Sequence, residues 1–130
     1  PSNPLRGHLN TFLPLGPAAQ RAGHHVVFAS GPDMEQHVEC RGLVAWPIGP
    51  THAQLGGSRQ ASWLDYFARS AAGRAVDLLS LADEWKPDLV IHEDTEFAGA
   101  LVAVRSGARH IVHGLGLMPR WTSGQLSMVD

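Results

Sequence analysis

Four short apolar runs divide the chain. In each run the hydrophobic residues, many of them Val and Ile, occupy consecutive positions instead of alternating with polar ones, and Gly, Pro or acidic residues end the run. Consecutive apolar positions are typical of strands buried on both faces, as in a parallel sheet covered by helices. The predicted strands are residues 25–30, 43–49, 88–94 and 110–116.

Segments with helical patterns lie between the predicted strands. Three of them end at a glycine, which often terminates a helix, and the longest is amphipathic and stops before a proline. The predicted helices are residues 11–23, 33–42, 61–86 and 95–107. Helices that alternate with buried strands predict an α/β fold: a doubly wound, Rossmann-like parallel sheet with helices on both faces.

The first predicted helix has no strand before it, because residues 1–6 have the composition of a loop. A β-α-β unit requires a strand at that place. Residues 122–130 likewise add no closing element. We therefore expect residues 1–130 to be one domain of a larger protein, with the first strand of the domain missing. Residues 47–59, rich in Gly and Pro, are expected to form a mobile loop.

Composition and charge narrow the range of partners. The 130 residues are 44% hydrophobic and 17% charged, which suits one globular domain with a core. The net charge of −2 gives no support for a nucleic acid or an anionic membrane as partner. No apolar run could span a membrane, and no signal peptide is visible. The single cysteine, Cys40, excludes an internal disulfide and fits a reducing, cytoplasmic location.

The sequence around His8 has the pattern of a ligand-binding turn. In an open α/β sheet, ligands bind beyond the carboxyl ends of the strands, and the turn before the first helix faces that crevice. Gly7 would allow a sharp turn and Asn10 would cap the helix, so that His8 stands at the mouth of the crevice. The positive end of the helix would keep the imidazole neutral and able to accept a proton. The alternative is that His8 is only a polar turn residue.

Titratable residues are concentrated at the end of the third predicted strand. They are His92, Glu93, Asp94 and Glu96. Strand ends of a parallel sheet face the same crevice, and a carboxylate that holds the second ring nitrogen makes a histidine a better base. Asp94 is a rival to Glu93 for that task, but it is also well placed to cap the following helix. His92 is expected to be a buried strand-end residue.

Three segments carry a family resemblance: RGHLNTFLPLGPAAQRAGHHVVFAS, PDMEQHVECRGLVAWPIG and KPDLVIHEDTEFAGALVAVRSGARHIVHGLG. In this order they cover nearly the whole chain and resemble the GT-B glycosyltransferases that decorate antibiotics and other natural products in actinomycete bacteria. The resemblance implies that the chain is the N-terminal, acceptor-binding domain. It also implies that the C-terminal domain of the same protein, which binds the nucleotide sugar, lies outside this chain, and that the family's first strand precedes Pro1.

The resemblance implies a reaction as well. The histidine of the family's Gly-His pair is typically the general base that deprotonates the acceptor hydroxyl, which gives this role to His8. The family usually has a carboxylate directly after the third predicted strand, and Glu93 occupies that place, where Asp is commoner. We therefore favour Glu93 over Asp94 as the partner of His8. The sugar would move from a nucleotide-diphosphate sugar to the acceptor in one displacement that inverts the anomeric configuration. Thr11 and Pro17 depart from the family pattern.

Aromatic residues are candidates for binding the acceptor. Trp63, Tyr66 and Phe67 lie on one side of a predicted helix, a pattern more typical of a core, but they directly follow the loop 47–59. Apolar and aromatic walls suit a flat polycyclic acceptor. The residues expected to contact the acceptor are Asn10, Trp63, Phe67, Asp94, Met118 and Trp121.

The eight histidines lack the spacing of a metal site. His24 and His25 would point to opposite faces of a strand, and so would His110 and His113. The chain has no Asp-X-Asp pair, no P-loop and no GxGxxG. We therefore expect no metal and no cofactor, with the nucleotide sugar as a co-substrate. The alternative function is a non-catalytic, flavodoxin-like module that binds a small ligand, in which His8 only forms a hydrogen bond.

Overall fold

The computed structural model describes residues 1–59 and 62–115. All four predicted strands are present, and each begins and ends within three residues of its predicted ends. The helices and strands are, in chain order, α1 Arg6–Phe12, α2 Leu15–Arg21, β1 Val27–Ser30, α3 Glu35–Glu39, β2 Val44–Pro47, α4 Trp63–Trp85, β3 Leu89–Glu93, α5 Phe97–Ser106 and β4 Arg109–His113. Short 3₁₀ turns lie at Pro32–Met34 and Gly57–Arg59.

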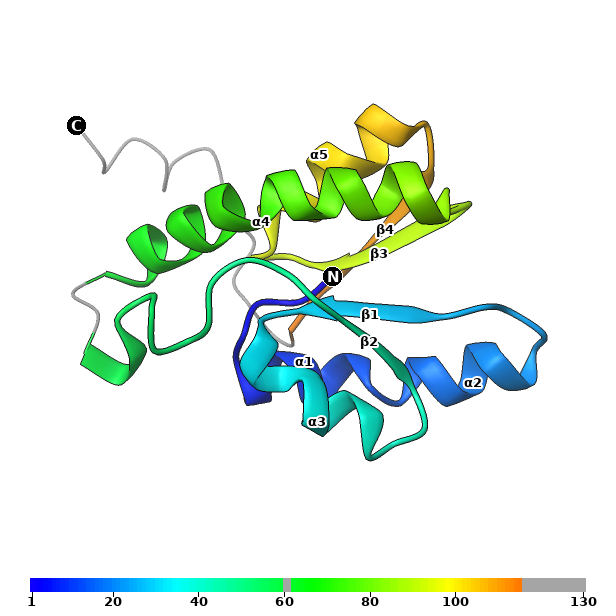
Figure 1. Cartoon of the computed structure of the whole chain (residues 1–130), viewed down its shortest axis with the longest axis horizontal. Helices are drawn as coiled ribbons and strands as arrows, with labels where there is room; N and C mark the ends of the chain where they lie inside the picture. The colour runs from blue at the N-terminus through cyan, green and yellow to red at the C-terminus, as the bar shows by residue number, and fades with distance from the viewer. Residues whose placement is uncertain (60–61, 116–130) are drawn as a thin grey trace.

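The strands form two parallel pairs (Figure 1). β1 pairs with β2, with Val27 opposite Val44, and β3 pairs with β4, with Leu89 opposite Arg109. Both pairs are parallel, which confirms the predicted strand direction. The strands of each pair are connected through a helix, as parallel pairing requires. The expected single sheet is instead divided, within the described residues, into these two pairs.

Helices cover both faces of the strands, as expected from the apolar runs. Figure 1 shows α4 and α5 on one side and α1, α2 and α3 on the other. Consecutive residues of β1 enter different cores: Phe28 packs with Leu9 and Phe12 of α1, whereas Ala29 packs with Leu78 of α4. Successive strand residues point to opposite faces, so burial on both sides requires consecutive apolar residues. This arrangement is the doubly wound α/β fold.

The start of the first helix differs from the prediction. α1 begins at Arg6, so Gly7 lies inside the helix with an ordinary backbone conformation, and Asn10 lies in its middle instead of capping it. The sharp turn lies upstream, and the helix needs no glycine hinge. The predicted single helix is interrupted at Leu13–Pro14, which separates α1 from α2. Pro17 then falls in the first turn of α2, where a backbone N–H has no helical acceptor, so the proline is tolerated there.

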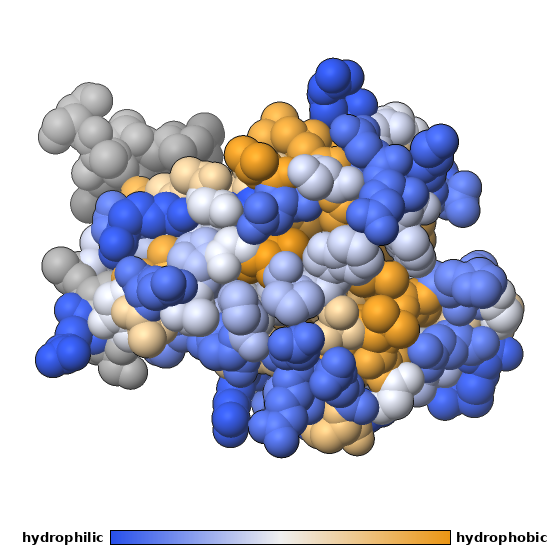
Figure 2. Space-filling model, in the orientation of Figure 1, coloured by the Kyte–Doolittle hydropathy of each residue, from blue (hydrophilic) through white to orange (hydrophobic). Residues whose placement is uncertain are grey.

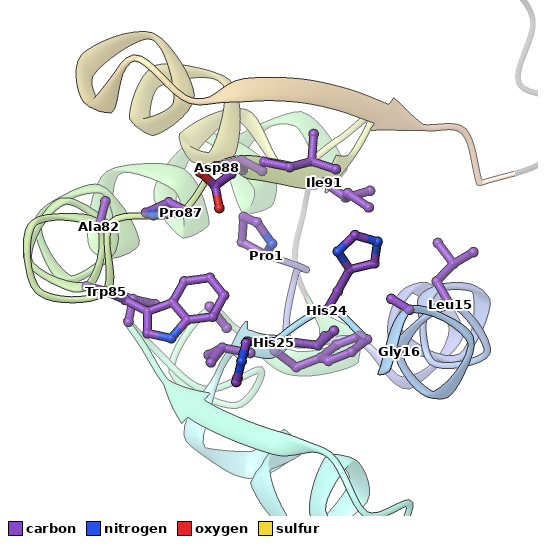
Figure 3. A pocket seen from close by; sticks show the side chains of 18 of the residues that line it. Pro1, Leu15, Gly16, His24, His25, Ala82, Trp85, Pro87, Asp88 and Ile91 are labelled. Carbon is purple, nitrogen blue, oxygen red and sulfur yellow. The ribbon is translucent and has the colours of Figure 1, made fainter. Parts of the chain in front are cut away.

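A cavity of about 640 Å³ separates the two strand pairs (Figure 3). Its walls come from β1, β3, α2 and α4, and Figure 3 shows Pro1, His24, Trp85 and Ile91 around it. Figure 2 shows hydrophobic surface in the middle of this face, between the two groups of helices. Ser2 bridges the two pairs, because its N–H donates to the Ala29 carbonyl of β1 (3.0 Å) and its hydroxyl donates to Glu93 of β3 (3.1 Å).

Gly49, just after β2, allows a close approach of two backbones. Its φ is +59°, and a Cβ atom there would collide with Cγ of the buried Arg74 and lie 3.2 Å from the Gly73 carbonyl oxygen. We expect Gly49→Ala to lower the free energy of unfolding by about 2–4 kcal/mol, because the left-handed conformation and the collision add. Gly42→Ala is the matched control: its φ is +71°, and a Cβ atom there would meet nothing within 4 Å. It should cost only about 1–2 kcal/mol. Equal losses in urea-induced unfolding would show that Arg74 exerts no packing constraint on Gly49.

Candidate active site

His8 and Glu93 meet at the carboxyl end of β3. Glu93 is the last residue of the strand and is fully buried, while His8 lies in the first turn of α1 and its side chain is 21% exposed. The Nδ1 atom of His8 is in direct hydrogen-bond contact with Oε2 of Glu93. The pair therefore consists of a buried carboxylate and an imidazole that reaches the surface at the crevice end of the strand.

The second carboxylate oxygen of Glu93 is also held. Oε1 accepts hydrogen bonds from the backbone N–H of Asn3 and from Oγ of Ser2 (3.1 Å). Thr95 donates its hydroxyl to Oε2 (3.3 Å). Burial raises the pKa of Glu93, but the contact with His8 and the donors Asn3 and Ser2 outweigh it, so this pKa lies below its ordinary value.

The charge state of Glu93 fixes the protonation of the imidazole contact. An ionised carboxylate can only accept hydrogen bonds, so Nδ1 of His8 must carry the proton in this contact. In a neutral imidazole the other nitrogen, Nε2, then has its lone pair free. When the ring is neutral, Nε2 can therefore accept one proton, and the buried negative charge of Glu93 lies behind it.

Asp94 neither caps α5 nor contacts His8 in the structure. α5 begins at Phe97, two residues later than predicted, so Asp94 is too far upstream to cap it. The capping residue is Glu96, whose Oε2 accepts from the Gly99 N–H (2.7 Å). The contact to His8 comes from Glu93, and the Asp94 backbone N–H donates to the His113 carbonyl of β4 (3.2 Å). The sequence pattern D-T-E allows two cap positions, and the predicted one is wrong.

Aromatic side chains from the start of α4 lie beside His8. The Phe67 ring centroid is 5.7 Å from that of His8, and Trp63 stacks on Phe67 at 5.9 Å with an interplanar angle of 27°. Trp63 remains 53% exposed. Tyr66 is buried behind them, its hydroxyl is 2.9 Å from Nδ1 of His52, and burial raises its pKa to about 12. Phe67 and Trp63 thus form an exposed aromatic wall next to the imidazole.

One predicted contact residue, Asn10, is not brought to this place. Asn10 is exposed, and its Oδ1 is 2.8 Å from Nε2 of His37 on α3. Met118 and Trp121 lie outside the described residues. The cavity between the strand pairs contains His24 and His25 but neither His8 nor Glu93 in its lining. The cavity and the His8–Glu93 pair are therefore separate features.

The residues that hold Glu93 from behind carry no visible mark in the sequence. Ser2 and Asn3 belong to a segment with loop composition. Pro1 and Pro4 mark a turn, which indicates that the backbone of this segment is restricted, but no local pattern predicts which side chain it meets.

Within residues 1–59 and 62–115, no three His, Cys, Asp or Glu side chains gather as a metal-binding group. No helix in the same ranges is both long and apolar enough to cross a membrane.

Comparisons with known proteins agree with this architecture. The family model of the erythromycin biosynthesis protein CIII-like N-terminal domain matches residues 60–126. L-demethylnoviosyl transferase of Streptomyces niveus is 33% identical over 132 residues, covering 91% of this chain and 34% of the relative. Erythronolide mycarosyltransferase of Saccharopolyspora erythraea is 31% identical, covering 81% of this chain and 33% of the relative.

Solved structures show the same fold. The glycosyltransferase SnogD from Streptomyces nogalater superposes with a TM-score of 0.76 at 30% identity, covering 88% of this chain and 33% of SnogD. The calicheamicin glycosyltransferase CalG4 superposes with a TM-score of 0.79 over 98% of this chain and 34% of CalG4, at 17% identity. These neighbours confirm the predicted fold class, that of the N-terminal half of a GT-B glycosyltransferase.

The chain spans about a third of the length of the relatives that it matches. The family model covers 67 of the 130 residues, and the relatives and solved neighbours belong to the same group of natural-product glycosyltransferases. The chain belongs to the erythromycin biosynthesis protein CIII-like N-terminal domain family.

Proposed function

We propose that this chain is the acceptor-binding half of an inverting glycosyltransferase that moves a sugar from a nucleotide-diphosphate sugar to a hydroxyl of a small natural product. The observation that carries the proposal is the His8–Glu93 contact at the strand end, beside the exposed aromatic wall. The relatives support it by their names, since they are transferases of sugars such as mycarose and desosamine. The solved structure of SpnG is a complex with thymidine diphosphate, and that of VinC is a complex with DTDP.

In this proposal His8 is the general base. Nε2 takes the proton of the acceptor hydroxyl as its oxygen attacks the anomeric carbon, and the bond from that carbon to the nucleotide diphosphate breaks. Glu93 stabilises the imidazolium that forms, because its buried charge faces the Nδ1 proton. A positioned base of this kind typically contributes about 10²–10⁴-fold to the rate. The site for the nucleotide diphosphate belongs, in this proposal, to a C-terminal domain outside the chain.

The aromatic wall is proposed to hold the acceptor. Phe67 lies beside His8 with its ring tilted by 43° to the imidazole, and the half-exposed Trp63 stacks on Phe67. A flat polycyclic or aromatic acceptor stacked there would present a hydroxyl to Nε2. Asp94, partly exposed beside Glu93, stays a predicted acceptor contact, as do Met118 and Trp121.

We expect Trp63→Ala to raise KM for the acceptor by about tenfold with little change in kcat. Loss of a stacking surface weakens ground-state and transition-state binding alike, and tenfold corresponds to about 1.4 kcal/mol. Trp85→Ala is the matched control, because Trp85 is 39% exposed at the opposite end of α4 and lies in the lining of the cavity. Steady-state kinetics with varied acceptor concentration measure both constants. A fall in kcat at constant KM would remove Trp63 from the binding role.

The direct test supplies a panel of nucleotide-diphosphate sugars and polycyclic acceptors to the complete protein that contains this chain. We expect a glycoside by mass spectrometry, with an inverted anomeric centre by NMR coupling constants. A chelator should leave the rate unchanged, because no divalent cation takes part in the proposed step. Binding of an acceptor without turnover on any sugar donor would favour the alternative, a non-catalytic flavodoxin-like module. Retention of configuration would exclude the single displacement.

A further inference from the structure

A buried arginine lies beneath the segment that holds Glu93. Arg74, in the middle of α4, is fully buried, and Nη1 donates to the carbonyl oxygen of Ser2 at 2.5 Å. Its guanidinium also lies 3.8 Å from Oε1 of Glu96, which is equally buried. Within the described part of the chain, Nε and Nη2 of Arg74 have no hydrogen-bond partner. A buried guanidinium with so few contacts is a poor way to stabilise a core, so its presence requires another explanation.

The peptide group that Arg74 contacts is the one that faces Glu93. The Ser2 carbonyl and the Asn3 N–H belong to the same planar, trans peptide unit, in which the oxygen and the hydrogen point in opposite directions. Arg74 and the hydroxyl of Ser30 (3.0 Å) both donate to the oxygen, and the hydrogen is donated to Oε1 of Glu93. Fixing one end of this rigid unit therefore fixes the direction of the other. The cation also polarises the peptide, which strengthens the hydrogen bond that its N–H donates.

A second side chain of α4 supports the same segment. Ser70 precedes Arg74 by four residues and so lies on the same face of the helix. Its hydroxyl donates to Oδ1 of Asn3 (2.8 Å), and Nδ2 of Asn3 donates in turn to the carbonyl of Thr95 (3.1 Å). The segment Ser2–Asn3 is thus held by α4 on one side and by the end of β3 on the other.

We propose that Arg74 is a positioning residue, which orients the Ser2–Asn3 peptide so that it binds Oε1 of Glu93 and leaves Oε2 on His8. Its effect on turnover rests on the proposed function, whereas its effect on Glu93 does not. The titratable and charged groups in this network are His8 from α1, Arg74 from α4, Glu93 at the end of β3, and Glu96, which caps α5. Loss of Arg74 should leave the Ser2 carbonyl to the weaker, neutral hydroxyl donor of Ser30, lower the occupancy of the hydrogen bond to Oε1, and loosen the carboxylate against the imidazole.

The test compares Arg74→Met, the double variant Arg74→Met/Glu96→Gln, and Glu96→Gln alone in the complete protein. Arg74→Met leaves the buried carboxylate of Glu96 without its positively charged partner and is therefore expected to destabilise the fold. The double variant removes both charges of the pair, and the glutamine that replaces Glu96 in it can still cap α5 through its amide oxygen. Carbon-13 NMR follows the titration of the Glu93 carboxyl, and steady-state kinetics give kcat and KM. Arg105→Met, at an exposed arginine of α5, is the control.

We expect the double variant to titrate Glu93 at a higher pH than either the wild type or Glu96→Gln. We also expect its kcat to fall by about tenfold to a hundredfold, the range typical for loss of a hydrogen-bond partner that orients a metal-ligating side chain, with KM little changed. A purely electrostatic role predicts instead that removing both charges restores the wild-type titration. A folded double variant with unchanged Glu93 titration and unchanged kcat overturns the proposal. If His8→Ala leaves turnover intact while the Arg74→Met/Glu96→Gln variant still titrates Glu93 at a higher pH, the proposed function fails and the positioning role stands.

Discussion

Replacing His8 by alanine is expected to lower the rate of sugar transfer by at least about a hundredfold, with little change in acceptor affinity. The reason lies in the geometry of the pair. Nδ1 donates its proton to the ionised Glu93, so the lone pair of Nε2 remains to accept the proton of an acceptor hydroxyl. Alanine removes this lone pair and the imidazolium that Glu93 would stabilise, whereas the aromatic wall that would bind the acceptor stays in place.

The measurement is kcat and KM of the complete protein at saturating nucleotide sugar. His25→Ala is the matched control, since His25 is exposed and lies in the lining of the cavity, away from the pair. The control should transfer sugar at the wild-type rate. Turnover near the wild-type level in His8→Ala would exclude His8 as the base and would leave the binding-module alternative as the better account of the site.

The second large effect is expected from Glu93→Gln, with a fall in kcat of at least about a hundredfold and a retained fold. Ser2 and Asn3 both donate to Oε1, so the amide oxygen of Gln would occupy that position. Its NH₂ group would then face Nδ1 of His8 and donate to it. The ring proton would be forced onto Nε2, which could no longer accept a proton from the acceptor. The substitution therefore removes a charge and reverses the tautomer in one step.

Glu39→Gln, at an exposed residue of α3, controls for the change of charge and should behave as the wild type. Unfolding at several pH values gives a second readout. The folded pKa of Glu93 is lowered, so this carboxylate contributes stability above its unfolded pKa, and that contribution is lost as the pH falls through the folded value. Glu93→Gln should lack this part of the acid dependence. A variant with wild-type kcat would show that Glu93 does not orient the base.

The fold was predictable because burial on two faces leaves a local signature. The adjacent residues Phe28 and Ala29 enter separate cores, and this requirement is visible as consecutive apolar letters. Helix ends were predicted well where a glycine adopts a positive φ, as at Gly23 and Gly107. Helix starts were predicted poorly, because several consecutive polar residues can each cap a helix. Which of them does so depends on the path of the chain in the folded structure. Gly7, Asn10 and Asp94 were each given a turn or cap position that the structure assigns elsewhere.

The sequence predicted the two central residues of the site but not the residues that support them. His8 and Glu93 stood out because each carries chemistry at a place where parallel strands end. Ser2, Asn3 and Arg74 carry no such mark, since a loop residue and a helical arginine are ordinary in isolation. Their importance follows from contacts between segments about 70 to 90 residues apart, and no short-range pattern encodes such contacts.

The His8–Glu93 contact also has a consequence for folding kinetics, because its two residues are separated by 85 positions. Helices form within about a microsecond from local contacts, whereas parallel pairing and such distant contacts require long loops to close first. The 23-residue α4 should therefore gain its helical signal early in refolding. The imidazole and the carboxylate can meet only when α1, β3 and the segment Ser2–Asn3 have docked. Recovery of the pair, followed by the environment of His8, should coincide with the slowest folding phase and so mark the completed domain.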